Sequence, residues 1–103
     1  MDEPREYPTD FSLICAAILT SAVADICGRP VAEVRRRGLD WALADRREPR
    51  TRPERAAAAS ARAWLLGAPG VVSAEEACDA VGVRREKVVS ILLGETAPAQ
   101  RAA

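Results

Sequence analysis

Side chains that serve as general bases or nucleophiles are scarce in this chain. Among its 103 residues there is no histidine, no asparagine and only one tyrosine. A Ser–His or Cys–His pair therefore cannot form, and the usual general base at neutral pH is missing. Glu75 and Glu76 are adjacent, but neighbours on a helix point about 100° apart, so they are better explained as acids in a helix first turn. The six glycines are scattered and form no phosphate-binding loop. We expect no enzymatic activity.

The cysteines suggest packing rather than chemistry. Cys15, Cys27 and Cys78 are odd in number and widely spaced, which argues against a disulfide framework. Zinc sites of the common kinds need closely spaced Cys or His pairs, and the chain has none. We expect three buried, small apolar residues in a reducing compartment, with no metal and no cofactor.

Nothing near the N-terminus resembles a targeting or membrane segment. The first six residues are acidic and lack the basic segment of a secretory signal. The charge-free run from Phe11 to Ala24 has 14 residues, which is too short to span a bilayer. These features predict a cytoplasmic protein with no membrane partner.

Residues 73–94 carry the clearest motif. Ser73 followed three residues later by Glu76 is the pattern of a capping box at a helix start. Gly82 can adopt the positive φ that ends a helix, and a second short helix then runs to Gly94. Val88, Ile91 and Leu92 have the spacing of one buried helical face.

This pattern resembles the helix-turn-helix superfamily, as in sigma-factor region 4 and phage-type repressors. That motif has a small residue four places before the turn glycine, here Cys78, where alanine is usual. It has apolar residues on both sides of the glycine, here Val81 and Val83. It also has apolar residues six and nine places after the glycine, here Val88 and Ile91.

The resemblance implies that the second helix enters the major groove of duplex DNA by its N-terminal residues. The candidate DNA contacts are Arg84, Arg85, Glu86, Lys87 and Ser90. Arg can pair with guanine, Glu can accept from cytosine, and Lys can hold phosphate. However, residues 73–94 carry four acids against three basic residues, so DNA binding would depend on charges elsewhere.

Those charges lie in the middle of the chain, where residues 29–62 contain ten arginines against five acids. Phosphate contacts need a basic footprint of this kind. The candidate phosphate contacts are Arg35, Arg36, Arg37, Arg50 and Arg52. The alternative is that these arginines coat solvated helices and a solvated loop at 46–53.

Ala and Leu carry much of the apolar content, and no alternating strand pattern occurs, so the sequence predicts an all-α fold. We expect a compact bundle of four to five helices, with one domain at 10–94 and disordered tails at 1–9 and 95–103. Asp10 is the expected N-cap of a helix from Phe11 to Cys27. Trp64 is the expected core anchor near the end of a later helix that begins at Pro53 or Glu54 and closes at Gly67.

The helix from Phe11 to Cys27 is apolar nearly all round, because its few polar residues are scattered. Such a helix is either the centre of the domain or partly covered by a second subunit. A homodimer through this helix is therefore expected.

Two functions fit these features. The preferred one is a small DNA-binding helix-turn-helix protein, a transcriptional regulator of bacterial or phage type. The alternative is a protein-interaction module of the same fold, such as a transcription adaptor or a phage assembly factor similar to a small terminase subunit. In the alternative, the apolar first helix and Trp64 serve subunit contacts.

Overall fold

Five helices pack around the first one in the computed structural model, which describes residues 7–94. Residues 1–6 and 95–103, and with them most of the two predicted tails, lie outside the described residues. The helices are α1 (Thr9–Cys27), α2 (Val31–Arg37), α3 (Leu39–Ala44), α4 (Arg52–Leu65), α5 (Ala74–Val81) and α6 (Arg85–Leu93). No strand occurs between residues 7 and 94, so the all-α prediction is confirmed.

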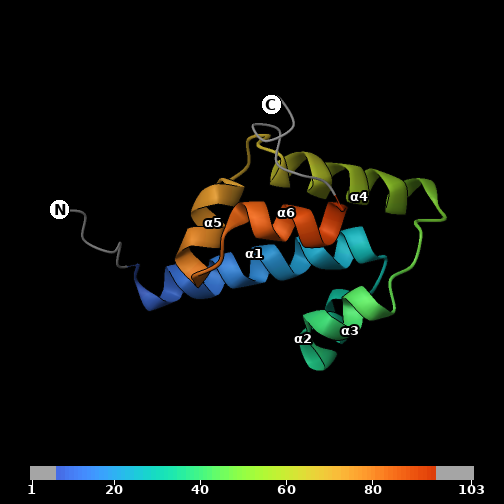
Figure 1. Ribbon diagram of the computed structural model, residues 1–103, viewed down its shortest axis with the longest axis horizontal. Helices are drawn as coiled ribbons and strands as arrows, with labels where there is room; N and C mark the ends of the chain where they lie inside the picture. The colour runs from blue at the N-terminus through green and yellow to red at the C-terminus, as the bar shows by residue number, and fades with distance from the viewer. Residues whose placement is uncertain (1–6, 95–103) are drawn as a thin grey trace.

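Helix α1 is the centre of the arrangement, because it contacts each of the other five helices. In Figure 1, α5 crosses the N-terminal half of α1, α4 and α6 lie along its C-terminal half, and the α2–α3 pair packs at its C-terminal end. The core follows this division. Cys15 and Leu19 of α1 pack with Ala77 and Cys78 of α5, and the C-terminal half of α1 packs with the remaining helices.

The core consists mainly of small residues. Leu65, Val34 and Val89 are the largest side chains that are almost fully buried. All three cysteines are free and buried, as predicted, and burial raises the pKa of each thiol. They therefore stay protonated and pack as small apolar groups.

The start of α1 differs from the prediction. Pro8 occupies the N-cap position, so the helix begins at Thr9 and Asp10 lies in its first turn. Tyr7, within the stretch assigned to a tail, stacks on Phe11 with 5.4 Å between ring centroids. Its hydroxyl also donates to Asp79 Oδ2 at 2.8 Å. These contacts to α1 and α5 order residues that the local sequence had marked as a tail.

Residues 7–94 form six helices where four to five were expected, because Gly38 divides one helical region into two. With φ at 96° it interrupts the helical path and separates α2 from α3. From the local sequence alone, residues 31–44 are compatible with one helix or with two. Trp41 of α3 is partly buried, and the guanidinium carbons of Arg29 and Arg37 lie 5.3 and 4.9 Å from its ring centroid.

Helix α4 begins earlier than predicted because Thr51 caps it. The Thr51 hydroxyl accepts from the Glu54 N–H, and the Glu54 carboxylate accepts from the Thr51 N–H, so the capping box is complete. At the other end, Trp64 packs against both halves of the core. Its Nε1 donates to the Val72 carbonyl at 2.8 Å, which fixes the loop leading into α5. Trp64 is thus a core anchor, as predicted.

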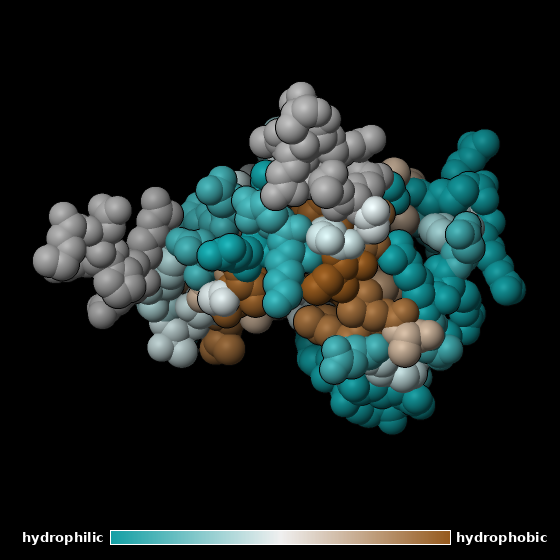
Figure 2. Space-filling model, viewed as in Figure 1, coloured by the Kyte–Doolittle hydropathy of each residue, from teal (hydrophilic) through white to brown (hydrophobic). Residues whose placement is uncertain are grey.

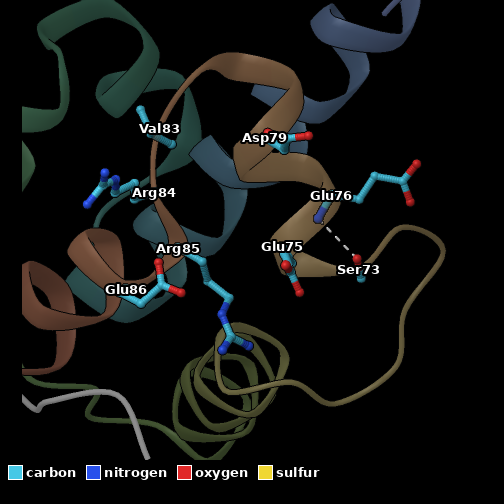
Figure 3. A pocket seen from close by; sticks show the side chains of 8 residues that line it. All are labelled: Ser73, Glu75, Glu76, Asp79, Val83, Arg84, Arg85 and Glu86. Carbon is cyan, nitrogen blue, oxygen red and sulfur yellow. Dashed lines mark hydrogen bonds between the residues drawn. The ribbon is translucent and has the colours of Figure 1, made fainter. Parts of the chain in front are cut away.

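Helices α5 and α6 form a hairpin at the predicted position. The Ser73 hydroxyl accepts from the Glu76 N–H at 3.1 Å, and Gly82 ends α5 with φ at 82°. The Glu76 carboxylate points away from Ser73, so the expected capping box is only half formed (Figure 3).

The buried face of α6 differs from the one that the motif predicts. Val89 and Leu92 are buried, whereas Ile91 is 52% exposed. Val83, which as the apolar residue after the turn glycine is predicted to pack into the core, is 45% exposed. Leu92 is buried as predicted and Val88 is partly buried against the core, so the buried face of α6 differs by including Val89 in place of Ile91. The prediction of buried Val83 and Ile91 was wrong, because five apolar residues near the end of α6 allow more than one buried face.

Replacing Gly28 with alanine should destabilise the fold by about 1–3 kcal/mol, lowering the melting temperature by roughly 5–15 °C. Gly28 ends α1 with φ at 66°, and a Cβ there would lie 2.6 Å from the Arg47 carbonyl oxygen. That carbonyl is held nearby because the Arg47 N–H donates to the Cys27 carbonyl at 2.9 Å. The measurement is thermal unfolding followed by circular dichroism.

Gly82→Ala is the matched control. Gly82 also has positive φ, but a Cβ there would meet nothing within 4 Å. Backbone strain alone should then cost about 1 kcal/mol. Equal losses for the two variants would show that the contact with Arg47 does not matter.

Candidate functional site

The predicted DNA-contacting residues do not form one outward surface. Arg84, Glu86, Lys87 and Ser90 are exposed, but Arg85 is half-buried. The Arg85 side chain runs toward the end of α4, where its Nη1 lies beside Gly67 (Figure 3). Its Nε is buried with no acceptor among the residues described. One of the two arginines expected to read bases is therefore packed against its own chain.

The surface between α5 and α6 is acidic. A pocket of about 480 Å³ opens there, and Figure 3 shows the side chains around it. Four carboxylates line it against two guanidinium groups, those of Arg84 and Arg85. The acids are Glu75, Glu76, Asp79 and Glu86. A phosphate backbone approaching this hairpin would meet like charges, which makes the site unfavourable for DNA.

The predicted phosphate contacts on α2 are exposed, and two of the three make contacts within their own chain. Arg36 Nη2 lies 3.5 Å from Glu33 Oε1, and Arg37 stacks on Trp41. Arg35 is exposed and has no ion-pair partner among the described residues. The sequence also missed Arg29, whose guanidinium forms an ion pair of 2.6 Å with Asp45.

Arg50 and Arg52, the other two candidates, flank the Thr51 cap of α4 and are exposed. Neither lines the cleft of about 550 Å³ that lies between α4 and the connection that precedes it. Four arginines that the sequence did not single out line this cleft: Arg46, Arg47, Arg55 and Arg62. Only the fold brings them together, because two come from a loop and two lie seven residues apart on a helix.

An apolar groove runs between α1 and α4. It has a volume of about 340 Å³, and its lining includes Ile18 and Ala22 of α1, Ala61 and Trp64 of α4, and Val71 from the loop. Val71 is completely exposed to solvent. The small residues at the floor leave space into which side chains of another molecule can insert.

The exposed face of α1 continues this groove toward the N-terminus. Leu13 and Ile14 are 64% and 55% exposed, and Ala17 and Ser21 are exposed beside them. We call Ile14, Ala17, Ile18 and Ser21 the α1 stripe, because their spacing places them on one side of the helix.

Asp25 closes the α1 stripe at its C-terminal end. Burial raises the pKa of its carboxyl group. It forms no ion pair with any residue that the structure describes. The rim of the groove therefore carries an uncompensated acid.

By length and composition alone, α1 is sufficient to cross a membrane, with a mean hydropathy of 1.7. The core helix of a soluble protein meets the same criterion, and α1 is packed against five other helices. Figure 2 shows that hydrophobic residues also gather over α1 and α6 on the face drawn, while hydrophilic residues cover the α2–α3 pair.

Comparisons with models of protein families, with curated proteins and with solved structures gave no match to this chain. Geometry and charge therefore distinguish the three surfaces: the acidic pocket between α5 and α6, the arginine-lined cleft and the apolar groove.

Proposed function

We propose that this chain is a protein-interaction module that associates through α1, with a second copy of itself as the partner. The observation that carries the proposal is the exposure of Leu13 and Ile14 on the central helix, in line with an apolar groove. Large apolar residues gathered on one surface are typical of a protein-binding site.

The shape of the α1 stripe supports pairing with another helix. Ala17 and Ser21 are small and lie near its middle, so a second helix can approach closely there. Ile14 and Ile18 flank them and would fill the spaces of the opposing helix. An antiparallel pair centred near Ala17 would set Ile14 of one copy against Ser21 of the other.

A lipid surface is a less suitable partner for α1. Helices that lie on membranes carry Lys and Arg beside their apolar face. Helix α1 has no basic residue, and its two charged residues are Asp10 and Asp25. These acids would be repelled by anionic lipids but stay in water at the rim of a protein interface.

Photo-crosslinking tests this proposal. A benzophenone amino acid in place of Ile14 should give a covalent dimer on irradiation at tens of micromolar protein. The same group in place of Ile91, an exposed position of α6, should give little. A dimer that forms from position 91 and not from position 14 would move the interface to α6, and absence of a dimer from either position would reject self-association.

DNA binding by the α5–α6 hairpin is the second candidate function. The exposed basic residues Arg84 and Lys87 near the start of α6 favour it. The four carboxylates around the adjacent pocket and the packed Arg85 weigh against it. A transcriptional regulator of this type would lose DNA affinity in an Arg84→Ala/Lys87→Ala variant.

A further inference from the structure

The arginine-lined cleft is strongly basic. Its lining combines four arginines with a single acid, Glu48, and Ile26 of α1. The pocket beside α6, by comparison, has twice as many acids as arginines. A negatively charged ligand would therefore be drawn to the cleft rather than to the α5–α6 hairpin.

The connection that forms one wall of the cleft is held in place at several points. Arg46 Nη1 donates to the Leu92 carbonyl near the end of α6 at 2.5 Å. The Arg47 N–H donates to the Cys27 carbonyl of α1, and Arg55 Nη1 donates to the Arg50 carbonyl at 2.9 Å. These contacts hold the backbone of the connection and position the Arg46 and Arg55 side chains before any ligand binds, which lowers the entropic cost of binding.

The row of arginines is too long for a single phosphate group. Arg55 and Arg62 lie seven residues apart on α4, which separates them by about 10 Å along the helix axis. Arg50 and Arg52 extend the basic surface beyond the cleft. Several guanidinium groups over this length match a ligand with repeated phosphates, to which arginine can donate paired hydrogen bonds.

We propose that this cleft binds the phosphate backbone of a nucleic acid, with Arg47 and Arg55 as central contacts. The cleft has no feature that would read bases, so binding is independent of sequence. This inference does not depend on self-association through α1, because no residue of the α1 stripe lines the cleft.

Fluorescence anisotropy with a labelled duplex of about 20 base pairs tests the inference on the full chain. In about 0.1 M salt, Arg47→Ala/Arg55→Ala should weaken binding on the order of fiftyfold, and the slope of log K against log salt should become shallower by about 2. Arg35→Ala/Arg36→Ala on α2 removes the same charge elsewhere and should change the affinity less than threefold, since screening weakens distant charges. The other two cleft arginines, Arg46 and Arg62, are unchanged in the cleft variant. Circular dichroism checks that each variant is folded.

Three results would overturn the inference. Equal losses in the two arginine variants would indicate a general charge effect. A larger loss in Arg84→Ala/Lys87→Ala would place the contact on α6. Failure of the wild-type protein to bind the duplex even at low salt would exclude a nucleic-acid site. That conclusion would hold even if the protein bound tripolyphosphate.

Discussion

An Ile14→Glu/Ala17→Glu variant is expected to be monomeric at concentrations where the wild-type chain is dimeric, with the dissociation constant raised more than about a hundredfold. Both side chains lie on the α1 stripe and are exposed, so the substitutions should leave the monomer folded. In the dimer they would place four carboxylates in an apolar interface with no basic group on α1 to pair with them. Unpaired buried charges cost several kcal/mol, more than the contacts they replace can supply. Sedimentation velocity measures the change.

Val83→Glu/Ile91→Glu is the matched control for this experiment. It adds the same charge at two exposed apolar positions, one before α6 and one on it. We expect its self-association to equal that of the wild-type chain. Dissociation of the control, with the α1 variant still dimeric, would assign the interface to the α6 side of the molecule.

Trp64→Ala should lower the free energy of unfolding by about 3–5 kcal/mol and the melting temperature by roughly 15–30 °C. The indole packs against both halves of the core and holds the Val72 carbonyl. Its loss would leave a cavity between α1, α4 and the hairpin. Because a domain of this size has a total stability of about 5–15 kcal/mol, the variant should be marginally stable. Urea unfolding followed by circular dichroism gives the value.

Trp64→Phe separates packing from hydrogen bonding. The ring largely fills the same space, but the Val72 carbonyl loses its donor, at a cost of about 1–3 kcal/mol. The loss in the free energy of unfolding should therefore be larger for Trp64→Ala than for Trp64→Phe. A cost below about 1 kcal/mol for Trp64→Ala would contradict the role of this residue as a core anchor.

The helix ends could largely be predicted, because capping is decided by a few neighbouring residues. Ser73, Gly28, Gly82 and Gly94 end or begin helices where the sequence indicates. Thr51 carried an equally local signal, a threonine three residues before Glu54, which the prolines around it obscured. At Gly38 the local sequence allowed either a continuous or a broken helix. The helix is broken there, and α2 and α3 each pack on α1.

The orientation of α6 could not be predicted, since it depends on contacts with other helices. Val88, Val89, Ile91, Leu92 and Leu93 offer overlapping apolar faces. The predicted face consisted of Val88, Ile91 and Leu92. The packing buries Val89 and Leu92, keeps Val88 partly buried and leaves Ile91 exposed. Arg85 lies on the same side of α6 as Val88, Val89 and Leu92, so it is half-buried and does not join the predicted DNA-contacting face.

The basic cleft was also beyond prediction from sequence. Residues 29–62 were identified as basic, but the arginines that converge come from two separate segments of that stretch, the connection after α3 and helix α4. Arg35, Arg36 and Arg37 lie on one short helix, where Arg36 and Arg37 contact Glu33 and Trp41. Convergence of Arg46 and Arg47 with α4 depends on contacts of the connection with Leu92 and Cys27.

Sedimentation equilibrium of the unmodified chain tests the central claim most directly. With the α1 stripe as an interface, the weight-average mass should rise from that of one 11.0 kDa chain toward that of two as the protein concentration increases into the tens of micromolar. A mass that stays at one chain over this whole range would contradict self-association through α1.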